Sequence, residues 1–202
     1  MILSDLLLSA WILNTYNEND QKLYLTTLHL KSKLGNKGNA LNEFENEIFS
    51  DKITKTIQWD GPTSKEEYIN GLSEREQLNA NGKIHMFTII DSETNTPMGS
   101  IDIRPDENKF IADVGLWIGE KYSGKGVGTS AIQKISDYGF SSLSLNKIEA
   151  YIFSGNIASR KVFEKCGYLL EGTIRSKIIK RGVEIDEWVF GILKREWENG
   201  KN

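Results

Sequence analysis

Three closely spaced glycines stand in the segment Ser123-Gly-Lys-Gly-Val-Gly-Thr129, a few residues after the apolar run Leu116-Trp-Ile118. The pattern that follows predicts a helix over residues 129–142, so the glycines lie where a strand gives way to a helix. Free amides at the start of a helix bind anions, and glycine lets the backbone approach phosphate oxygens without a Cβ in between. These residues therefore predict a pyrophosphate-binding turn.

Two well-known phosphate loops compete for this segment. Residues 119–125 match the start of the nucleoside-triphosphate loop, but that loop needs Ser or Thr after its lysine to bind magnesium, and Gly126 stands there. Residues 126–131 match the dinucleotide fingerprint, with Glu149 near the distance expected for a ribose contact. Glu149 falls inside the next predicted strand rather than at its end, so a dinucleotide-binding domain is the poorer fit.

A third reading of the segment extends to residues well beyond it. The stretch 123–128 resembles the pyrophosphate loop of the GNAT superfamily of N-acetyltransferases, Arg/Gln-x-x-Gly-x-Gly/Ala, except that Ser123 stands at the first position. A second family motif follows in order, because Asn156 and Ser159 match Asn-x-x-Ser, and residues 164–168 are similar to Glu-Lys-x-Gly-Phe. Two motifs in the right order make the likeness specific.

Further stretches are similar to the RimJ/RimL branch of that superfamily. The resemblance covers about Lys22 to Trp197 and leaves out residues 1–17 and 31–39. The additional matching stretches are Trp59 to Ser64, Ala112 to Gly119, Glu171 to Arg175, Asp186 to Leu193 and Glu196-Trp197.

The resemblance implies a fold, a reaction and a co-substrate. The fold would be α/β, with a mixed, mostly antiparallel central sheet between helices, splayed open between the strands at 113–119 and 147–153. Acetyl-CoA would lie in the opening and lose its acetyl group to a primary amine by direct attack on the thioester. The residues implied to hold it are Leu116, Trp117, Ile118, Ser123, Gly124, Lys125, Gly126, Val127, Gly128, Thr129, Asn156 and Phe163.

Two catalytic residues are implied by the same resemblance. Asp113 stands where many relatives have Glu, and it would accept the amine proton through a water; the plainer alternative is an ion pair with a neighbouring cation. Phe163 stands where relatives often have a tyrosine acid, so Ser159 becomes the candidate donor to the leaving thiolate. Ser159 could instead only bond back to its own helix.

The acceptor side is less well defined by the sequence. Trp59 lies beside Asp60-Gly-Pro62, at a loop tip where exposed aromatics contact ligands, so we expect it to form a substrate wall. Glu149 and Asp186 are further candidate bases, and Asp186 is also a substrate-side candidate. A protein N-terminus, a polyamine and an aminoglycoside all remain possible acceptors. Because Ser123 and Phe163 replace usual family side chains, a coenzyme-binding module without turnover is the alternative function.

Hydrophobic periodicity predicts the elements that must position these residues. Helical spacing or capping residues predict helices at 4–16, 40–49, 64–79, 129–142 and 156–165. Alternating or β-branched runs predict strands at 22–30, 84–90, 98–103, 111–119, 147–153, 168–179 and 184–194. Arg181-Gly182 predicts a hairpin turn between the last two strands, and residues 31–39 read as a loop.

Composition sets the remaining expectations. The 202 residues are 39% hydrophobic and 26% charged, which predicts one globular domain over 1–202. The resemblance implies a family core at 22–197, and helical spacing predicts an extra helix within 1–17. A formal net charge of -3 gives no large positive field for a nucleic-acid backbone. One cysteine and two histidines predict no metal site and suit a reducing cytoplasm. The apolar start is too short to span a membrane, and monomer and homodimer both remain open.

Overall fold

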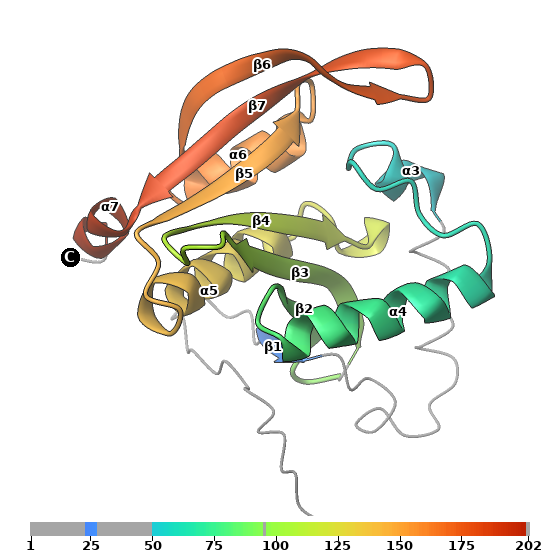
Figure 1. Ribbon diagram of the computed structural model, residues 1–202, viewed down its shortest axis with the longest axis horizontal. Helices are drawn as coiled ribbons and strands as arrows, with labels where there is room; N and C mark the ends of the chain where they lie inside the picture. The colour runs from blue at the N-terminus through green and yellow to red at the C-terminus, as the bar shows by residue number, and fades with distance from the viewer. Residues whose placement is uncertain (1–22, 28–49, 95, 201–202) are drawn as a thin grey trace, which may run out of the picture.

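The computed structural model describes residues 23–27, 50–94 and 96–200, and seven strands in these ranges form one sheet (Figure 1). The spatial order is β1-β2-β3-β4-β5-β7-β6. Only β4 and β5 run parallel, and every other neighbouring pair is antiparallel. The strands are β1 (Leu23–Thr27), β2 (His85–Asp91), β3 (Pro97–Pro105), β4 (Ile111–Ile118), β5 (Lys147–Phe153), β6 (Leu169–Lys180) and β7 (Val183–Leu193).

Helices cover both faces of this sheet. Figure 1 shows α4 on one face of the β2–β4 half and α5 on the other, with α6 behind β5. Ser64 caps α4, because its Oγ accepts a hydrogen bond from the amide of Glu67 at 3.1 Å. The described helices are α3 (Asp51–Thr54), α4 (Lys65–Ala80), α5 (Val127–Ser141), α6 (Ile157–Lys165), α7 (Lys194–Asn199) and the 3₁₀ turn η1 (Glu120–Tyr122).

The sheet opens between its two parallel strands. β4 and β5 pair only from Ile111 opposite Lys147 to Asp113 opposite Glu149. Beyond these three pairs the strands diverge, although β4 continues to pair with β3 as far as Ile118. The predicted mixed sheet, with its opening beside residues 113–119, is therefore confirmed.

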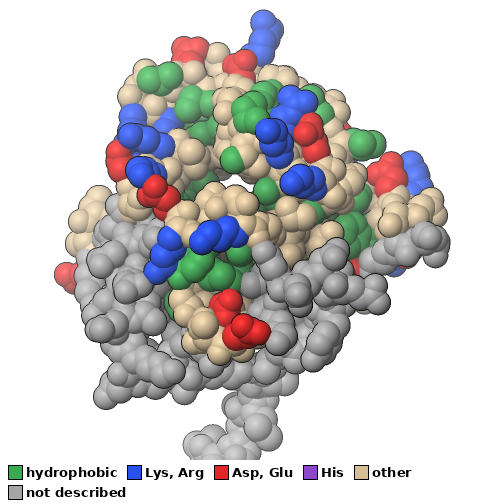
Figure 2. Space-filling view, turned by 180° about the vertical axis from the view of Figure 1, so that it is seen from behind, with side chains coloured by type: hydrophobic (Ala, Val, Ile, Leu, Met, Phe, Trp, Pro, Cys, Tyr) green, Lys and Arg blue, Asp and Glu red, His purple; other side chains and the backbone are tan. Residues whose placement is uncertain are grey.

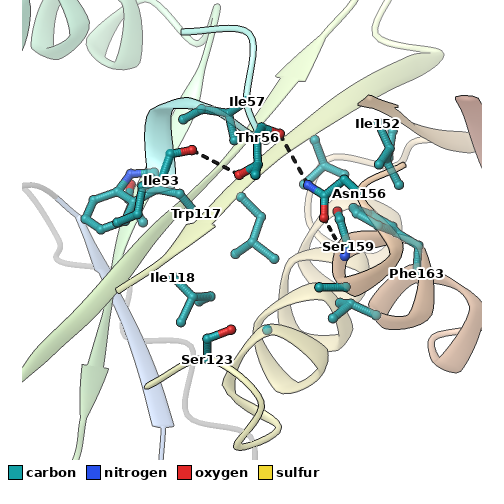
Figure 3. A pocket seen from close by; sticks show the side chains of 18 of the residues that line it. Ile53, Thr56, Ile57, Trp117, Ile118, Ser123, Ile152, Asn156, Ser159 and Phe163 are labelled. Atoms are coloured by element: carbon teal, nitrogen blue, oxygen red, sulfur yellow. Dashed lines mark hydrogen bonds between the residues drawn. The ribbon is translucent and has the colours of Figure 1, made fainter. Parts of the chain in front are cut away.

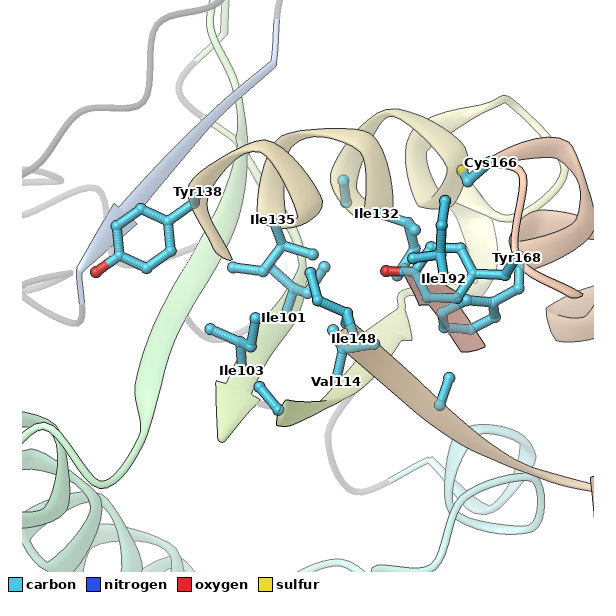
Figure 4. Close-up of a cluster of buried hydrophobic side chains, with 14 of the residues drawn as sticks. Ile101, Ile103, Val114, Ile132, Ile135, Tyr138, Ile148, Cys166, Tyr168 and Ile192 are labelled. Atoms are coloured by element: carbon cyan, nitrogen blue, oxygen red, sulfur yellow. The ribbon is translucent and has the colours of Figure 1, made fainter. Parts of the chain in front are cut away.

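The hydrophobic core lies between α5 and the inner face of the sheet (Figure 4). Ile132 and Ile135 of α5 are fully buried against Ile101 and Ile103 of β3 and Ile148 of β5. Side chains alternate along a strand, so the neighbours of these isoleucines, such as Ser100 and Asp102, point to the opposite face. The core thus fixes which side chains of β3 and β4 face α4.

Most predicted elements are present with small shifts at their ends. The strands at 84–90, 98–103, 111–119 and 147–153 and the helix at 64–79 are confirmed as β2, β3, β4, β5 and α4. The helix predicted at 129–142 begins instead at Val127, because Gly126 takes a left-handed φ of 84° and starts it earlier. The last strand ends at Leu193, not Lys194, where α7 begins.

Three short elements were not predicted. α3 and η1 contain four and three residues, too few for any periodicity to show, and α7 follows β7 without an intervening turn residue. The helices predicted at 4–16 and 40–49 and the loop at 31–39 lie outside the described residues, as do both ends of the strand predicted at 22–30. No helix in the described part of the chain is long and apolar enough to cross a membrane.

Candidate active site

A cleft of about 1260 Å³ occupies the opening between β4 and β5. Small-molecule sites commonly measure about 300–1,000 Å³, so this cleft has room for a large coenzyme and a second molecule. One wall is the free part of β4, and the opposite wall is the end of β5 with α6. The segment 52–59 crosses the cleft, so that Thr56 and Ile57 lie between Trp117 and Asn156 (Figure 3).

The glycine turn forms one end of the cleft. Gly124 and Gly126 both take left-handed φ values, 74° and 84°, which L side chains rarely adopt. The first helical hydrogen bond of α5 runs from the amide of Ser130 to the carbonyl of Gly126, so the amides of Val127, Gly128 and Thr129 come before the helical ladder. Amides in this position suit an anion.

The predicted coenzyme-binding residues of this turn divide into two groups. Ser123, Gly124, Gly126, Gly128 and Thr129 line the cleft. Lys125 and Val127 are not part of the lining, and the side chain of Val127 is 5% exposed and belongs to the core.

Basic side chains surround the cleft on the back of the molecule. Lys161 and Lys165 of α6 line it and are exposed. Lys52 lines it from α3 and pairs with Glu120, which also lines it. Figure 2 shows Lys and Arg side chains around a central hollow on this face. A chain with a net negative charge therefore presents local positive charge where a phosphate-rich ligand would lie.

The first turn of α6 brings two predicted residues to the cleft. The Oδ1 of Asn156 accepts a hydrogen bond from the amide of Ser159 at 3.1 Å and caps the helix. Its Nδ2 donates to the carbonyl of Thr56, 100 residues away. The Oγ of Ser159 takes part in no hydrogen bond within the described chain, and Figure 3 shows it facing the cleft. This hydroxyl is available to a ligand.

Phe163 lies one turn further along α6 than Ser159. It is 3% exposed, lines the cleft and packs edge-on against Tyr168, with ring centroids 5.1 Å apart. It carries no proton to donate, so the acid position that the resemblance assigns to a tyrosine is here an apolar wall.

The segment that crosses the cleft is anchored on the β6–β7 hairpin. Lys180, 5% exposed, donates to the carbonyls of Gln58 and Trp59 and pairs with Asp60 at 2.6 Å. Glu187, 1% exposed, accepts a hydrogen bond from the side chain of Gln58. The sequence carries no local signal for these partners, because they lie 120 to 129 residues apart.

Trp59 and Asp113 mark the end of the cleft away from the glycine turn. The Trp59 ring lies under the guanidinium of Arg75 from α4, 5.2 Å from ring centroid to Cζ, and both residues line the cleft. Asp113 also lines it, and its Oδ2 accepts hydrogen bonds from Nε of Arg104 at 2.8 Å and from Nη2. The ion pair considered for Asp113 from the sequence is therefore present.

Two further candidates, Asp186 and Glu149, lie outside the cleft lining. Asp186 accepts a hydrogen bond from the amide of Ser176, within the β6–β7 hairpin. Glu149 pairs with Lys147 and accepts a hydrogen bond from the hydroxyl of Tyr151, which does line the cleft. Burial, together with the neighbouring Glu149, raises the pKa of Tyr151 to about 12, so this phenol stays protonated near neutral pH.

Comparison with known proteins decides the family. The model described as "Acetyltransferase (GNAT) domain" matches residues 39–169. The chain belongs to the GNAT acetyltransferase family. The GNAT match covers the glycine turn, the cleft and α6, so the family predicted from the sequence is confirmed, although the predicted extent of 22–197 is wider than the matched range.

Named GNAT relatives agree with the predicted RimJ/RimL branch. "Uncharacterized N-acetyltransferase p20" of Bacillus licheniformis is 36% identical over 121 residues, which are 59% of this chain and 68% of the relative. "Putative ribosomal N-acetyltransferase YdaF" of Bacillus subtilis is 39% identical over 96 residues, which are 48% of this chain. The match spans about half of that second relative, 52% of its length.

A solved structure shows the same GNAT fold over nearly the whole chain. The spermidine N-acetyltransferase of Vibrio cholerae, in complex with CoA and spermine, superimposes with a TM-score of 0.74 over 90% of this chain and 100% of that one. At 20% identity this likeness concerns the fold alone.

Proposed function

We propose that this protein is an acetyl-CoA-dependent N-acetyltransferase that moves the acetyl group from the thioester to a primary amine. The observation that carries the proposal is the end of β4–β5 pairing at Asp113 and Glu149, in a cleft that continues to the glycine turn. Beyond Asp113, the edge of β4 that faces β5 has no strand partner in the described part of the chain, and the amides of Val127, Gly128 and Thr129 come before the helical ladder of α5. Together they match a long ligand with amides at one end and phosphates at the other.

The residues present fit such a coenzyme. Leu116, Trp117 and Ile118 line the cleft, where the amides of a pantetheine arm would pair, as a strand does, with the backbone groups of β4 that face away from β3. The turn at 123–129 would hold the pyrophosphate, with the positive end of α5 behind it. Asn156 and Phe163 would flank the arm from the opposite wall.

The acetyl acceptor would enter from the end of the cleft that holds Trp59, Arg75 and Asp113. Attack requires a neutral amine, so a group near the acceptor nitrogen must take a proton. Asp113, which the resemblance indicates for this task, lies at this end. The relatives named for ribosomal proteins and for spermidine support a protein N-terminus or a polyamine as the acceptor.

Departure of the thiolate needs a proton or a hydrogen bond. Ser159 is the proposed donor, and two observations support it: its Oγ faces the cleft without a partner in the described chain, and its amide is held by Asn156. Its hydroxyl would donate to the sulfur directly or hold a water that does so.

A binding titration followed by a turnover assay tests the proposed function. Acetyl-CoA is titrated calorimetrically, and thiol release is then followed with a peptide N-terminus, spermidine and an aminoglycoside as acceptors. We expect binding, and thiol release with at least one amine. Binding without release on any amine would support a coenzyme-binding module, the alternative suggested by Ser123 and Phe163 in place of usual family side chains.

A pair of glycine variants tests the location of the coenzyme. Gly124 and Gly82 have φ values of 74° and 67°, and neither has an atom within 4 Å of an added Cβ, but only Gly124 lines the cleft. Both Gly→Ala changes cost similar backbone strain of about 1–2 kcal/mol. We expect only Gly124→Ala to weaken acetyl-CoA binding, by about tenfold, the equivalent of one lost hydrogen bond. Equal affinities would place the coenzyme elsewhere.

A further inference from the structure

A second carboxylate, Asp102, lies deeper at the acceptor end of the cleft than Asp113. It stands on β3 directly opposite Gly115 of β4 and lines the cleft. Its side chain is 18% exposed, and its Oδ1 is fully buried without a hydrogen bond from any described residue. The Oδ1 lies 3.1 Å from Nη1 of Arg104 as an ion pair, but not in hydrogen-bonding geometry.

Gly115 brings this carboxylate to the start of the opening. A Cβ built on Gly115 would lie 3.1 Å from Oδ2 and 3.2 Å from Oδ1 of Asp102, so the carboxylate rests against the backbone of β4. Gly115 is two residues past Asp113, where β4–β5 pairing ends, and two before Trp117. Asp102 therefore lies beside the part of β4 at which a bound thioester would become accessible.

Asp113 and Asp102 differ in the hydrogen bonds that their carboxylates already accept. Arg104 directs both Nε and Nη2 at one oxygen of Asp113, Oδ2, so two charge-assisted hydrogen bonds hold this carboxylate. The carboxylate of Asp102 accepts no hydrogen bond from the described residues. A buried acceptor without a donor costs folding free energy, and such costs are typical of groups kept for function.

Charges on three elements surround Asp102. Arg104 lies on its own strand, Asp113 on β4 and Arg75 on α4. Burial raises the pKa of the Asp102 carboxyl; Arg104 opposes this most strongly, Asp113 adds to it, and Arg75 opposes it weakly. A raised pKa of the carboxyl group lies closer to the pKa of an amine, so the carboxylate becomes a better proton acceptor.

We propose that Asp102, rather than Asp113, receives the proton of the acceptor amine, an inference that rests on the proposed function. The amine nitrogen forms a bond to the thioester carbonyl carbon while the carbon–sulfur bond breaks and its electron pair leaves on sulfur. The excess proton on nitrogen passes to an oxygen of Asp102, directly or through one water. Asp113 acts as a positioning residue that fixes Arg104 beside Asp102.

Neutralising variants test this assignment by their pH profiles. In the unmodified protein, kcat/KM with the best acceptor should fall as pH drops through the raised pKa of Asp102. Asp102→Asn should lower kcat/KM on the order of 100-fold, the usual contribution of a general base, and abolish this acidic limb. Asp113→Asn should keep the acidic limb of the kcat/KM profile. Glu107→Gln, which removes an exposed carboxylate of the β3–β4 turn, should leave activity and limb unchanged.

Acetyl-CoA affinity and stability separate catalysis from damage. Asp102→Asn should bind acetyl-CoA as tightly as the unmodified protein and unfold at no lower urea concentration at pH 7, because it removes a buried charge. A second variant, Asp102→Ser, should show the same loss if the amide variant folds poorly. A retained acidic limb in both variants, or its loss in Asp113→Asn alone, would overturn the assignment.

The proposed function and this inference can fail separately. If the unmodified protein acetylates an amine but Asp102→Asn keeps its rate and limb, only the inference fails. If no amine is acetylated, each amine is titrated calorimetrically in the presence of coenzyme A. Binding that Asp102→Asn weakens would then support an amine contact without turnover, whereas binding unaffected by the variant, or no binding at all, would overturn both.

Discussion

Gly99 of β3 lies very close to the backbone of β4, in the part of β4 that no longer pairs with β5. A Cβ built on Gly99 would lie 2.3 Å from the carbonyl oxygen of Trp117 and 3.1 Å from the Cα of Ile118. Ordinary contact begins at 3.4 Å, so Gly99→Ala requires β4 to move by about 1.1 Å at Trp117. The clashing atom is backbone, so no side-chain rotation relieves it.

The displacement has two measurable consequences. Inserting a methyl group into a packed interior costs about 1–3 kcal/mol, which should lower the urea midpoint of unfolding. A misplacement of 1 Å at a reacting centre costs on the order of 100-fold in rate, and Trp117 lies on the wall that would position the thioester. We therefore expect weaker acetyl-CoA binding by calorimetry and a large loss of thiol release.

Gly71→Ala is the matched control for Gly99→Ala. Gly71 lies inside α4, and an added Cβ would meet no atom within 4 Å. Alanine is favoured over glycine in a helix by about 0.5–1 kcal/mol, so this variant should unfold at a higher urea concentration with unchanged acetyl-CoA affinity. If Gly99→Ala also kept its affinity and its midpoint, the close approach of β3 to Trp117 would be refuted.

Three further variants address the proposed roles. Ser159→Ala should lower kcat for thiol release on the order of 100-fold with unchanged acetyl-CoA affinity; a normal kcat would remove Ser159 from the mechanism. Arg104→Gln removes the cation that opposes the raised pKa of Asp102, so the acidic limb of kcat/KM should move to higher pH; an unmoved limb contradicts the pairing. Lys180→Met removes the ion pair with Asp60 and the hydrogen bonds to the carbonyls of Gln58 and Trp59, so it should release this segment and raise KM for the acceptor by at least about tenfold, leaving acetyl-CoA affinity intact.

Local sequence patterns were sufficient to predict the strands and the glycine turn that form the cleft. The period-two pattern of residues 84–90, 98–103 and 111–119, with turn residues between the runs, predicts the three antiparallel strands, because such a period shows without a distant partner. The glycines at 124 and 126 likewise reveal a turn, since left-handed φ values select glycine whatever surrounds them. The one error there, a helix start placed at Thr129 instead of Val127, arose because Gly126 itself begins the helix.

The site depended more on the resemblance and on distant contacts. The cleft lining includes Asp113, Ser159 and most of the predicted coenzyme-binding residues, but not Asp186, whose side chain is occupied by the amide of Ser176. Asp102 was not singled out, because an aspartate within an alternating strand reads as an ordinary solvent-facing residue. Its burial comes from α4 and β4, which the local pattern does not contain.

The sequence by itself determined the strands, the glycine turn and the family, because each depends on residues close together in the chain. Tertiary structure alone decided which carboxylate oxygen beside the opening receives no hydrogen bond from the described residues, the Oδ1 of Asp102. It also decided how Lys180 holds the segment over the cleft, through a hydrogen bond to the carbonyl of Gln58, which lies 122 residues away in the sequence. Such contacts form only when whole helices and strands pack together. The side chains that make them show no periodicity and belong to no motif, so the sequence does not reveal them.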